Sequence, residues 1–217
     1  MAKEMTSRDR ILAALSLKEP DRVPIAMRRM EPMEHLWKDR FERALFLRDR
    51  FGIDDFITVG HAWPYDPSVK EERTWKTWGE KAYPLLVTDY QTPAGTLHAE
   101  VMMTEDYRVD RLRLDADQLV PRMVDRPIKG RDDVARFRYL LGDPTCCNLA
   151  AWDETVRNHV AFGRSEGFPI GFYMPSISGI AMKNIGVLEI VVRAADGDPL
   201  VEELLDALLE WTLQWLD

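Results

Sequence analysis

Three short segments of this 217-residue sequence carry side chains that could do chemistry, and each comes at the end of an apolar run. The segments are residues 27–29 (MRR), 60–63 (GHAW) and 173–176 (YMPS). If the apolar runs are parallel β-strands, their carboxyl ends lie at one edge of the sheet, where barrels and open α/β sheets bind their ligands. The three segments together are therefore the expected ligand site.

Arg28 and Arg29 are the expected substrate-binding cations. They follow residues 23–27 (VPIAM), a short apolar run that is typical of a buried parallel strand. A guanidinium group at this place matches the planar geometry of a carboxylate or a phosphate. The alternative is that both arginines form ion pairs with Glu31 and Glu34, which follow them in the sequence.

His61 is the expected catalytic residue, and it follows a second strand predicted over residues 54–60. Histidine changes its charge near neutral pH, so it could act as an acid, a base or a metal ligand. The alternative is a histidine that is merely hydrogen-bonded in a loop. Tyr173 and Met174 end a third strand, predicted over residues 168–173, and are the expected substrate-binding lining of the pocket. Core packing is the alternative for both.

The two cysteines, Cys146 and Cys147, are adjacent, so they cannot connect distant segments by a disulfide. A reducing cytosol is therefore the expected compartment. Because no Cys-x-x-Cys motif or nearby histidine accompanies the pair, a metal-bound or reactive thiol is not expected. No glycine-rich phosphate loop of either standard type occurs in the sequence. The sequence thus predicts no metal or cofactor that this chain binds by itself.

Composition and charge exclude several classes of protein. The 29 Lys and Arg residues against 37 Asp and Glu residues give a net charge of −8, which argues against a nucleic-acid or acidic-membrane binder. The apolar content of 46% is enough for a core. The charged start does not resemble a signal peptide, and the longest uncharged stretch, residues 167–182, is too short to span a bilayer. We therefore expect a cytoplasmic protein.

Capping signals and helical periodicity predict the elements that position the site. Thr6 with Asp9 marks a helix start, Gly52 a helix end, and Asp198 with Pro199 a second helix start. Helices are predicted over residues 7–17, 34–51, 131–141, 151–166, 187–195 and 199–216.

A β-hairpin is predicted from residues 85–90 and 96–104 around a turn at 91–95, inserted between a strand and its helix. Residues 175–179 are predicted to be a loop. Trp75 and Trp78 lie in a charged stretch, where we expect them to cover the mouth of a barrel.

Strands that alternate with helices pair in parallel through right-handed crossovers. Only three such strands are predicted, so the expected fold is the N-terminal part of an α/β (β/α)8 TIM barrel that stops before the barrel closes. Trp211, Trp215 and Leu216 form an apolar stripe on the last helix, with no later element to cover it. We therefore expect self-association, or binding of a C-terminal half-barrel, and no activity of the chain alone.

Five motifs occur along the chain in a characteristic order: residues 6–15 (TSRDRILAAL), 19–25 (EPDRVPI), 92–97 (TPAGTL), 119–122 (LVPR) and 132–141 (DDVARFRYLL). In order and spacing they resemble the uroporphyrinogen decarboxylase superfamily, and from the hairpin onward its divergent, methyltransferase-related members. The resemblance covers almost the whole chain. It implies one domain over residues 1–217, truncated before the C-terminal half of the barrel.

The resemblance also implies roles for particular residues. Decarboxylases of the superfamily hold the carboxylates of a tetrapyrrole with arginines after the first strand, where Arg28 stands here. They present an aspartate after the second strand and a tyrosine after the third, and this sequence has His61 and Ala181 nearest those positions. Uroporphyrinogen is therefore not the expected substrate, although a tetrapyrrole-binding lyase is the alternative in the same class.

The other branch of the superfamily implies a corrinoid-dependent methyltransferase. Such enzymes move a methyl group between a corrinoid protein and a thiol or a small methylated substrate, and their zinc ligands lie in the second half of the barrel. The implied partner is thus a corrinoid protein or a tetrapyrrole-like ligand, with zinc only in the full-length enzyme. The alternative from another class is a non-catalytic half-barrel that needs a partner chain.

Overall fold

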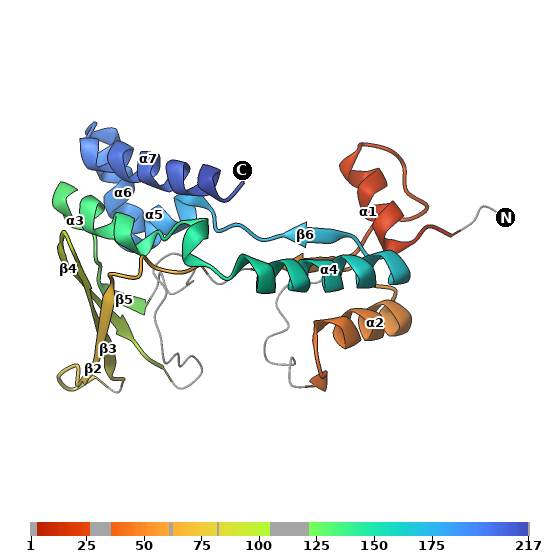
Figure 1. The fold of residues 1–217 in the computed structure, drawn as a ribbon, viewed down its shortest axis with the longest axis horizontal. Helices are drawn as coiled ribbons and strands as arrows, with labels where there is room; N and C mark the ends of the chain where they lie inside the picture. Colours follow the sequence, from red (N-terminus) through yellow and green to blue (C-terminus); the bar gives the residue numbers. More distant parts are fainter. Residues whose placement is uncertain (1–3, 27–35, 61–62, 82, 105–121, 217) are drawn as a thin grey trace. The chain divides into compact units, whose positions relative to one another are not determined.

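A computed structural model of the chain describes residues 4–26, 36–60, 63–81, 83–104 and 122–216. The chain forms two compact units (Figure 1). Unit 1 contains residues 1–61 and 149–173, and unit 2 contains residues 62–148 and 174–217. Among the described residues no helix is long and apolar enough to cross a membrane.

Unit 1 contains the parallel strand pair that the sequence predicts. Its elements are α1 (Ser7–Leu15), α2 (Arg40–Phe51), β1 (Ile57–Val59), α4 (Leu149–Glu166) and β6 (Ile170–Phe172). β1 and β6 pair in parallel, with Ile57 opposite Ile170 and Val59 opposite Phe172. The small core consists of Ala44 of α2, Ile57 of β1 and Phe168, with Phe162 of α4 and Ile170 of β6 packed against it.

Local hydrogen bonds explain where the helices of unit 1 begin and end. The Thr6 hydroxyl accepts from the Asp9 N–H at 3.1 Å and caps α1. Gly52 ends α2 with a φ of 65°, a left-handed conformation that glycine adopts without strain, and its N–H donates to the Arg48 carbonyl at 2.9 Å. The two caps are confirmed where the sequence predicts them.

A network of ion pairs holds the chain before β1. The buried Arg10 contacts Asp21 at 2.6 Å and the fully buried Asp54 at 2.5 Å. Arg22 contacts the other oxygen of Asp54 at 2.5 Å, and the Ser7 hydroxyl donates to Asp54 at 3.0 Å. These residues come from the first two motifs and from the start of the β1 segment, so the network joins segments that are far apart in the sequence.

The strand predicted over residues 23–27 is not present over its described residues, 23–26. The Asp54 N–H donates to the Ile25 carbonyl at 2.6 Å, but the Ile25 N–H donates to the Asp54 carboxylate at 3.3 Å, where a second strand would offer a carbonyl. Val23 is 77% exposed. The Asp54 side chain thus accepts the hydrogen bond that a neighbouring strand would accept from Ile25. The strand prediction is therefore wrong over residues 23–26.

Unit 2 is a four-stranded antiparallel sheet with helices on one face. The strand order is β2–β3–β4–β5. The strands are β2 (Lys70–Lys76), β3 (Leu85–Thr92), β4 (Gly95–Met102) and β5 (Met123–Asp125). The helices are α3 (Arg131–Phe137), which continues as η3 (Arg138–Leu140), η4 (Pro144–Cys146), α5 (Ile177–Ile185), α6 (Val187–Ala195) and α7 (Pro199–Gln214).

The predicted hairpin is confirmed as β3 and β4, which turn between Thr92 and Gly95. It belongs to a larger sheet, because β2 pairs along β3. The sequence of β2, KEERTWK, is charged and shows no apolar alternation, since this edge strand is mostly exposed to solvent. Trp75 lies on β2 and is 60% exposed, so it covers no barrel mouth in this structure.

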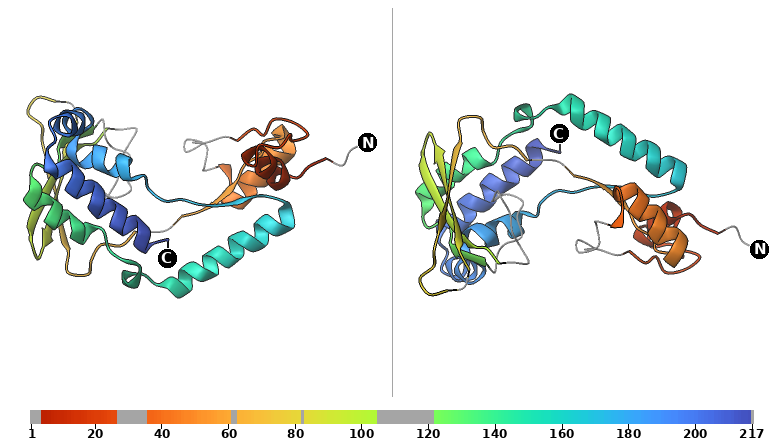
Figure 2. Two further views of the ribbon diagram at one scale, coloured as in Figure 1. Left: turned by 90° about the horizontal axis from the view of Figure 1, so that it is seen from above. Right: turned by 90° about the horizontal axis from the view of Figure 1, so that it is seen from below.

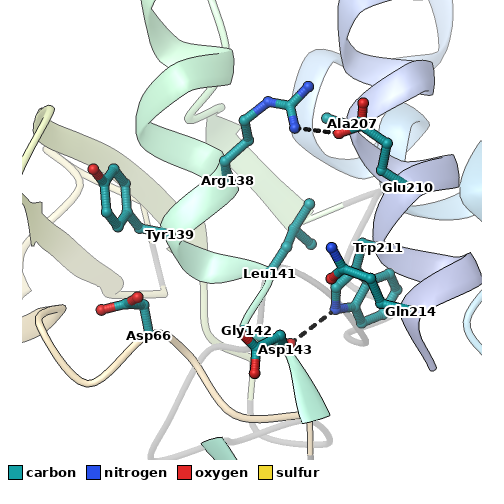
Figure 3. Close-up of a pocket in the computed structure, with 10 residues that line it drawn as sticks. All are labelled: Asp66, Arg138, Tyr139, Leu141, Gly142, Asp143, Ala207, Glu210, Trp211 and Gln214. Atoms are coloured by element: carbon teal, nitrogen blue, oxygen red, sulfur yellow. Dashed lines mark hydrogen bonds and ion pairs between the residues drawn. The ribbon is translucent and has the colours of Figure 1, made fainter. Parts of the chain in front are cut away.

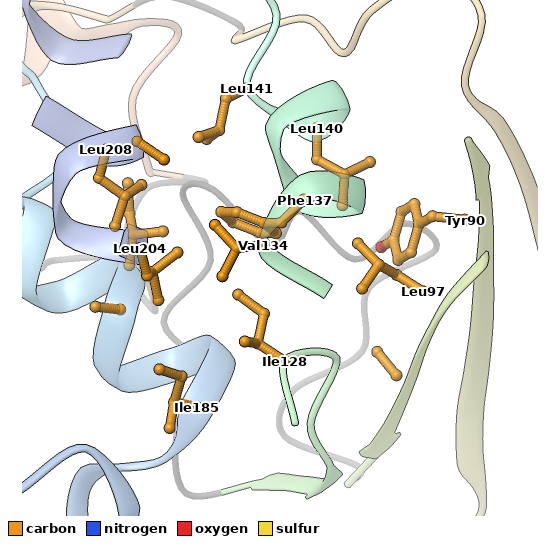
Figure 4. Packing of buried hydrophobic residues seen from close by; sticks show 14 of the residues in the cluster. Tyr90, Leu97, Ile128, Val134, Phe137, Leu140, Leu141, Ile185, Leu204 and Leu208 are labelled. Atoms are coloured by element: carbon orange, nitrogen blue, oxygen red, sulfur yellow. The ribbon is translucent and has the colours of Figure 1, made fainter. Parts of the chain in front are cut away.

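The core of unit 2 lies between the sheet and α3, α5 and α7 (Figure 4). Leu97 and Tyr90 face it from the strands, while Phe137 and Leu204 fill it from α3 and α7. α7 lies beside α3 and α5, as the views in Figures 1 and 2 agree. α5 begins at Ile177 with Ser176 as its cap, so residues 177–179, predicted as loop, are helical.

The terminal helix is covered by its own unit, contrary to the sequence prediction. Trp211 is 2% exposed, with its ring centroid 5.2 Å from that of Trp63. The indole N–H groups of Trp211 and Trp215 both donate to the Gly142 carbonyl, at 3.1 and 3.3 Å. Leu216 alone of the predicted stripe remains exposed, at 62%. An uncovered tryptophan stripe is therefore no reason for the chain to associate.

Over the part of the chain that the structure describes, the fold class is thus α/β with one parallel and one antiparallel sheet. The described residues form no closed barrel.

Candidate functional site

A cavity of about 500 Å³ lies in unit 1 where β1 and β6 end. Ile57 and Thr58 line it from β1, Gly60 lines it directly after β1, and Tyr173 lines it directly after β6. The other lining residues are Phe56, directly before β1, and five residues at or before the start of α2: Trp37, Lys38, Asp39, Arg40 and Arg43. The cavity is therefore at the carboxyl edge of the parallel pair, the edge at which α/β folds bind ligands.

The start of α2 is held at this cavity by its cap. The Asp39 carboxylate accepts from the N–H groups of Phe41 and Glu42, both at 2.9 Å. The Glu42 carboxylate reaches back to the Lys38 N–H at 2.6 Å. The Asp39 carboxylate thus caps the helix, the Glu42 carboxylate holds the residue before the cap, and together they fix the backbone on both sides of Asp39. The backbone that carries Lys38 and Arg40 is therefore fixed locally, on either side of the cap.

The lining is rich in positive charge. Arg40 donates to the Thr58 carbonyl, and Arg43 contacts Asp55 at 3.7 Å. Three cations, Lys38, Arg40 and Arg43, thus line the cavity against the single carboxylate of Asp39, which the helix cap already occupies. The N-terminus of α2 adds its partial positive charge. Together these groups favour an anionic ligand.

Asp55, one residue before the cavity-lining Phe56, is a buried carboxyl group. Its burial raises its pKa, while the Phe56 N–H and Arg43 oppose that shift. A carboxyl group with a raised pKa next to an arginine can change protonation state nearer to neutral pH than an exposed aspartate. It supports Arg43 at the cavity edge but does not line the cavity.

The structure places only some of the predicted site residues. Tyr173 lines the cavity, and its N–H donates to the Val59 carbonyl at 3.2 Å, which extends the parallel ladder by one bond. Met174 packs against the core of unit 2 and does not line this cavity, so core packing, the alternative, describes it. Arg28, Arg29 and His61 lie outside the described residues.

Sequence reasoning missed the three cavity cations, Lys38 just before α2 and Arg40 and Arg43 in its first turn. The predicted helix began at Glu34, so residues 38–43 were placed inside the helix and not at its N-terminus. The signal was present: Asp39 followed three residues later by Glu42 is a capping pair, and a helix that begins there carries Arg40 and Arg43 in its first turn.

A second cavity, of about 250 Å³, lies in unit 2 (Figure 3). Its charged groups already have partners within the chain: Arg138 contacts Glu210 at 2.5 Å, the Asp143 carboxylate accepts from the Thr145 N–H at 2.7 Å, and that of Asp66 accepts from the Ser68 N–H at 2.8 Å. The donors on Thr145 lower the pKa of Asp143. One cation, Arg138, lines this cavity against three carboxylates, so it does not favour an anionic ligand, and the cavity of unit 1 remains the candidate site.

Comparison with models of protein families, with curated proteins and with solved structures found no match to this chain. In the described part of the chain no cluster of three or more His, Cys, Asp or Glu residues could hold a metal ion.

Proposed function

We propose that this chain is the amino-terminal part of a barrel enzyme related to the uroporphyrinogen decarboxylase superfamily, on its methyltransferase branch. In this proposal the unit 1 cavity binds the anionic group of a small substrate, such as a thiol that accepts or supplies a methyl group. The observation that carries the proposal is the set of cations, Lys38, Arg40 and Arg43, at the carboxyl ends of two parallel strands.

The motifs of the resemblance support the proposal in a second way. Arg10, Asp21 and Arg22 belong to the two opening motifs, and all three contact one another or Asp54. Motif residues that assemble into one network around the buried Arg10 and Asp54 form a structural unit, as expected if the motifs describe a fold. The network involves Asp54 before the start of β1, whereas the cavity lies where β1 ends. In this proposal one end of the strand stabilises the fold and the other binds the ligand.

Arg28 and His61 complete the proposed site as an additional cation and as the acid or base. Chemistry is assigned to them from the sequence pattern, and a corrinoid protein is the proposed partner. The runner-up is a tetrapyrrole-binding enzyme, for which the same cations would hold ring carboxylates.

Binding of a small anionic thiol tests the proposal. Isothermal titration of the purified chain with 2-mercaptoethanesulfonate should show binding that Lys38→Ala and Arg40→Ala each weaken by roughly tenfold, about 1.4 kcal/mol. Arg50→Ala is the matched control, because Arg50 lies on the same helix but does not line the cavity. Equal losses in all three variants would mean a general charge effect and would contradict the proposed site.

Uroporphyrinogen should not be converted to coproporphyrinogen. His61 and Ala181 stand nearest the positions where the decarboxylase pattern has an aspartate and a tyrosine, and Ala181 is fully buried in unit 2. An alanine cannot supply the hydroxyl group. Chromatographic detection of coproporphyrinogen after incubation with the chain, or with the chain plus a complementary half-barrel, would favour the decarboxylase alternative.

The chain should associate with a second copy or with a C-terminal half-barrel. The β1–β6 pair is a two-stranded sheet, and large apolar side chains of unit 1 are exposed, including Leu15 at 76% and Phe51 at 62%. Isolated strand pairs are marginal, and open edges pair readily. Sedimentation velocity should therefore show concentration-dependent species. A monodisperse, catalytically active monomer would rule out the half-barrel proposal.

A further inference from the structure

The two cysteines form a pair of neighbouring thiols held in a fixed turn. Cys146 ends η4 and Cys147 follows it. The Cys146 N–H donates to the Asp143 carbonyl and the Cys147 N–H donates to the Pro144 carbonyl, both at 3.1 Å. Both thiols are free and half-buried. The backbone therefore presents two sulfur atoms from adjacent residues, with part of each side chain open to solvent.

Adjacent cysteines are poorly suited to a disulfide. Neighbouring Cα atoms are about 3.8 Å apart, whereas Cα atoms joined by a disulfide are usually about 4.4–6.8 Å apart. A bond between the two sulfurs would therefore close a strained ring. An atom inserted between the sulfurs enlarges that ring and relieves the strain. The spacing thus favours a bridged dithiol over a disulfide.

The surroundings also make these thiols weak nucleophiles. Burial raises the pKa of Cys146, and the negative charge of Asp143 raises it further. Burial, then Cys146 and Asp143, raise the pKa of Cys147. Both groups are therefore protonated at neutral pH, and a reagent that needs a thiolate will react slowly. A ligand whose own leaving group accepts the thiol proton does not need a thiolate to be formed beforehand.

We propose that Cys146 and Cys147 form a bidentate binding site for trivalent arsenic, as arsenous acid or an organoarsenous acid. Two S–As bonds form and two As–OH bonds break. The two thiol protons leave with the hydroxyl oxygens as two molecules of water, so no oxidation state changes. Thiol sulfur is a soft ligand and selects a soft ion of this kind. The site is independent of the function proposed for unit 1.

Phenylarsine oxide is the probe that tests this site. The reduced full chain should take up one molecule, seen in its intact mass, and should keep it in a large excess of glutathione but lose it to 2,3-dimercaptopropanol. Once one sulfur is bound, the second binds intramolecularly, so Cys146→Ser and Cys147→Ser should each weaken binding by at least about a hundredfold. Thr145→Ser, beside the pair, is the matched control and should keep the affinity.

Two results would overturn the proposal. One is a single-serine variant that binds phenylarsine oxide as tightly as the unaltered chain. The other is removal of the probe from the unaltered chain by glutathione alone, which shows attachment through one sulfur. The second measurement needs no variant, so it decides the question even if a serine variant folds poorly.

Discussion

Replacing Arg10 with alanine should lower the free energy of unfolding of unit 1 by about 3–5 kcal/mol. Arg10 is 2% exposed, and it binds Asp21 and Asp54 at 2.6 and 2.5 Å. Its removal leaves the fully buried Asp54 carboxylate with less positive charge around it. A buried charge without enough opposite charge nearby destabilises the folded state. Urea denaturation followed by circular dichroism measures the loss.

Two variants make this prediction specific. Arg8→Ala is the control on the same helix: the Arg8 side chain is 53% exposed and lies 3.8 Å from Asp9, so the change should stay within about 0.5 kcal/mol. Arg10→Lys should recover only part of the loss, because an ammonium group cannot bind two carboxylates with the fixed geometry of a guanidinium. Equal stability of the Arg8 and Arg10 variants would contradict a structural role for the network.

The same network predicts a pH dependence. Hydrogen bonds from the Arg10 side chain, and then from the Met5 N–H, hold the pKa of Asp21 well below its usual range. The folded form therefore keeps Asp21 ionised at pH values where the unfolded form takes up a proton. This contribution to stability is present above the ordinary aspartate pKa and is lost as the pH falls toward the folded value. Arg10→Ala should reduce the acid dependence of stability.

Replacing Trp211 with alanine should lower the free energy of unfolding of unit 2 by about 3–5 kcal/mol. Trp211 is 2% exposed, packs edge-on against Trp63, and donates to the Gly142 carbonyl. Truncation removes a large apolar surface and leaves a cavity that the surrounding helices and sheet cannot fill. Thermal unfolding should show a lower melting temperature, and urea denaturation measures the loss in the free energy of unfolding.

Leu213→Ala is the matched control for this prediction. Leu213 lies two residues along α7 and is 51% exposed, so the change should cost less than about 1 kcal/mol. Trp211→Phe separates packing from hydrogen bonding. It keeps most of the ring contact, and Trp215 still donates to the Gly142 carbonyl, so about 1 kcal/mol should be lost. A Trp211→Ala loss as small as that of Leu213→Ala would contradict the packing assigned to α7.

Features that depend on neighbouring residues could be predicted from the sequence alone. The Thr6 cap, the left-handed Gly52, the Asp198–Pro199 helix start and the hairpin turn at Thr92–Gly95 are all where the sequence places them. Each consists of hydrogen bonds within a few residues, so the local residue types are sufficient. The parallel pairing of β1 with β6 was also predictable, because alternating strands and helices allow few arrangements.

Features that depend on distant segments were decided by the tertiary structure. The Asp54 carboxylate accepts the hydrogen bond that a strand partner would accept from Ile25. The charged β2 segment is a strand because it pairs with β3. Trp211 of α7 is buried because it packs against Trp63 and donates to the Gly142 carbonyl. The cations of the candidate site follow the same rule: Lys38 and Arg40 become part of a cavity only because α2 begins beside the end of β1. An apolar stripe or a cationic side chain shows what a residue can bind, but only the packing of distant segments determines what lies opposite it.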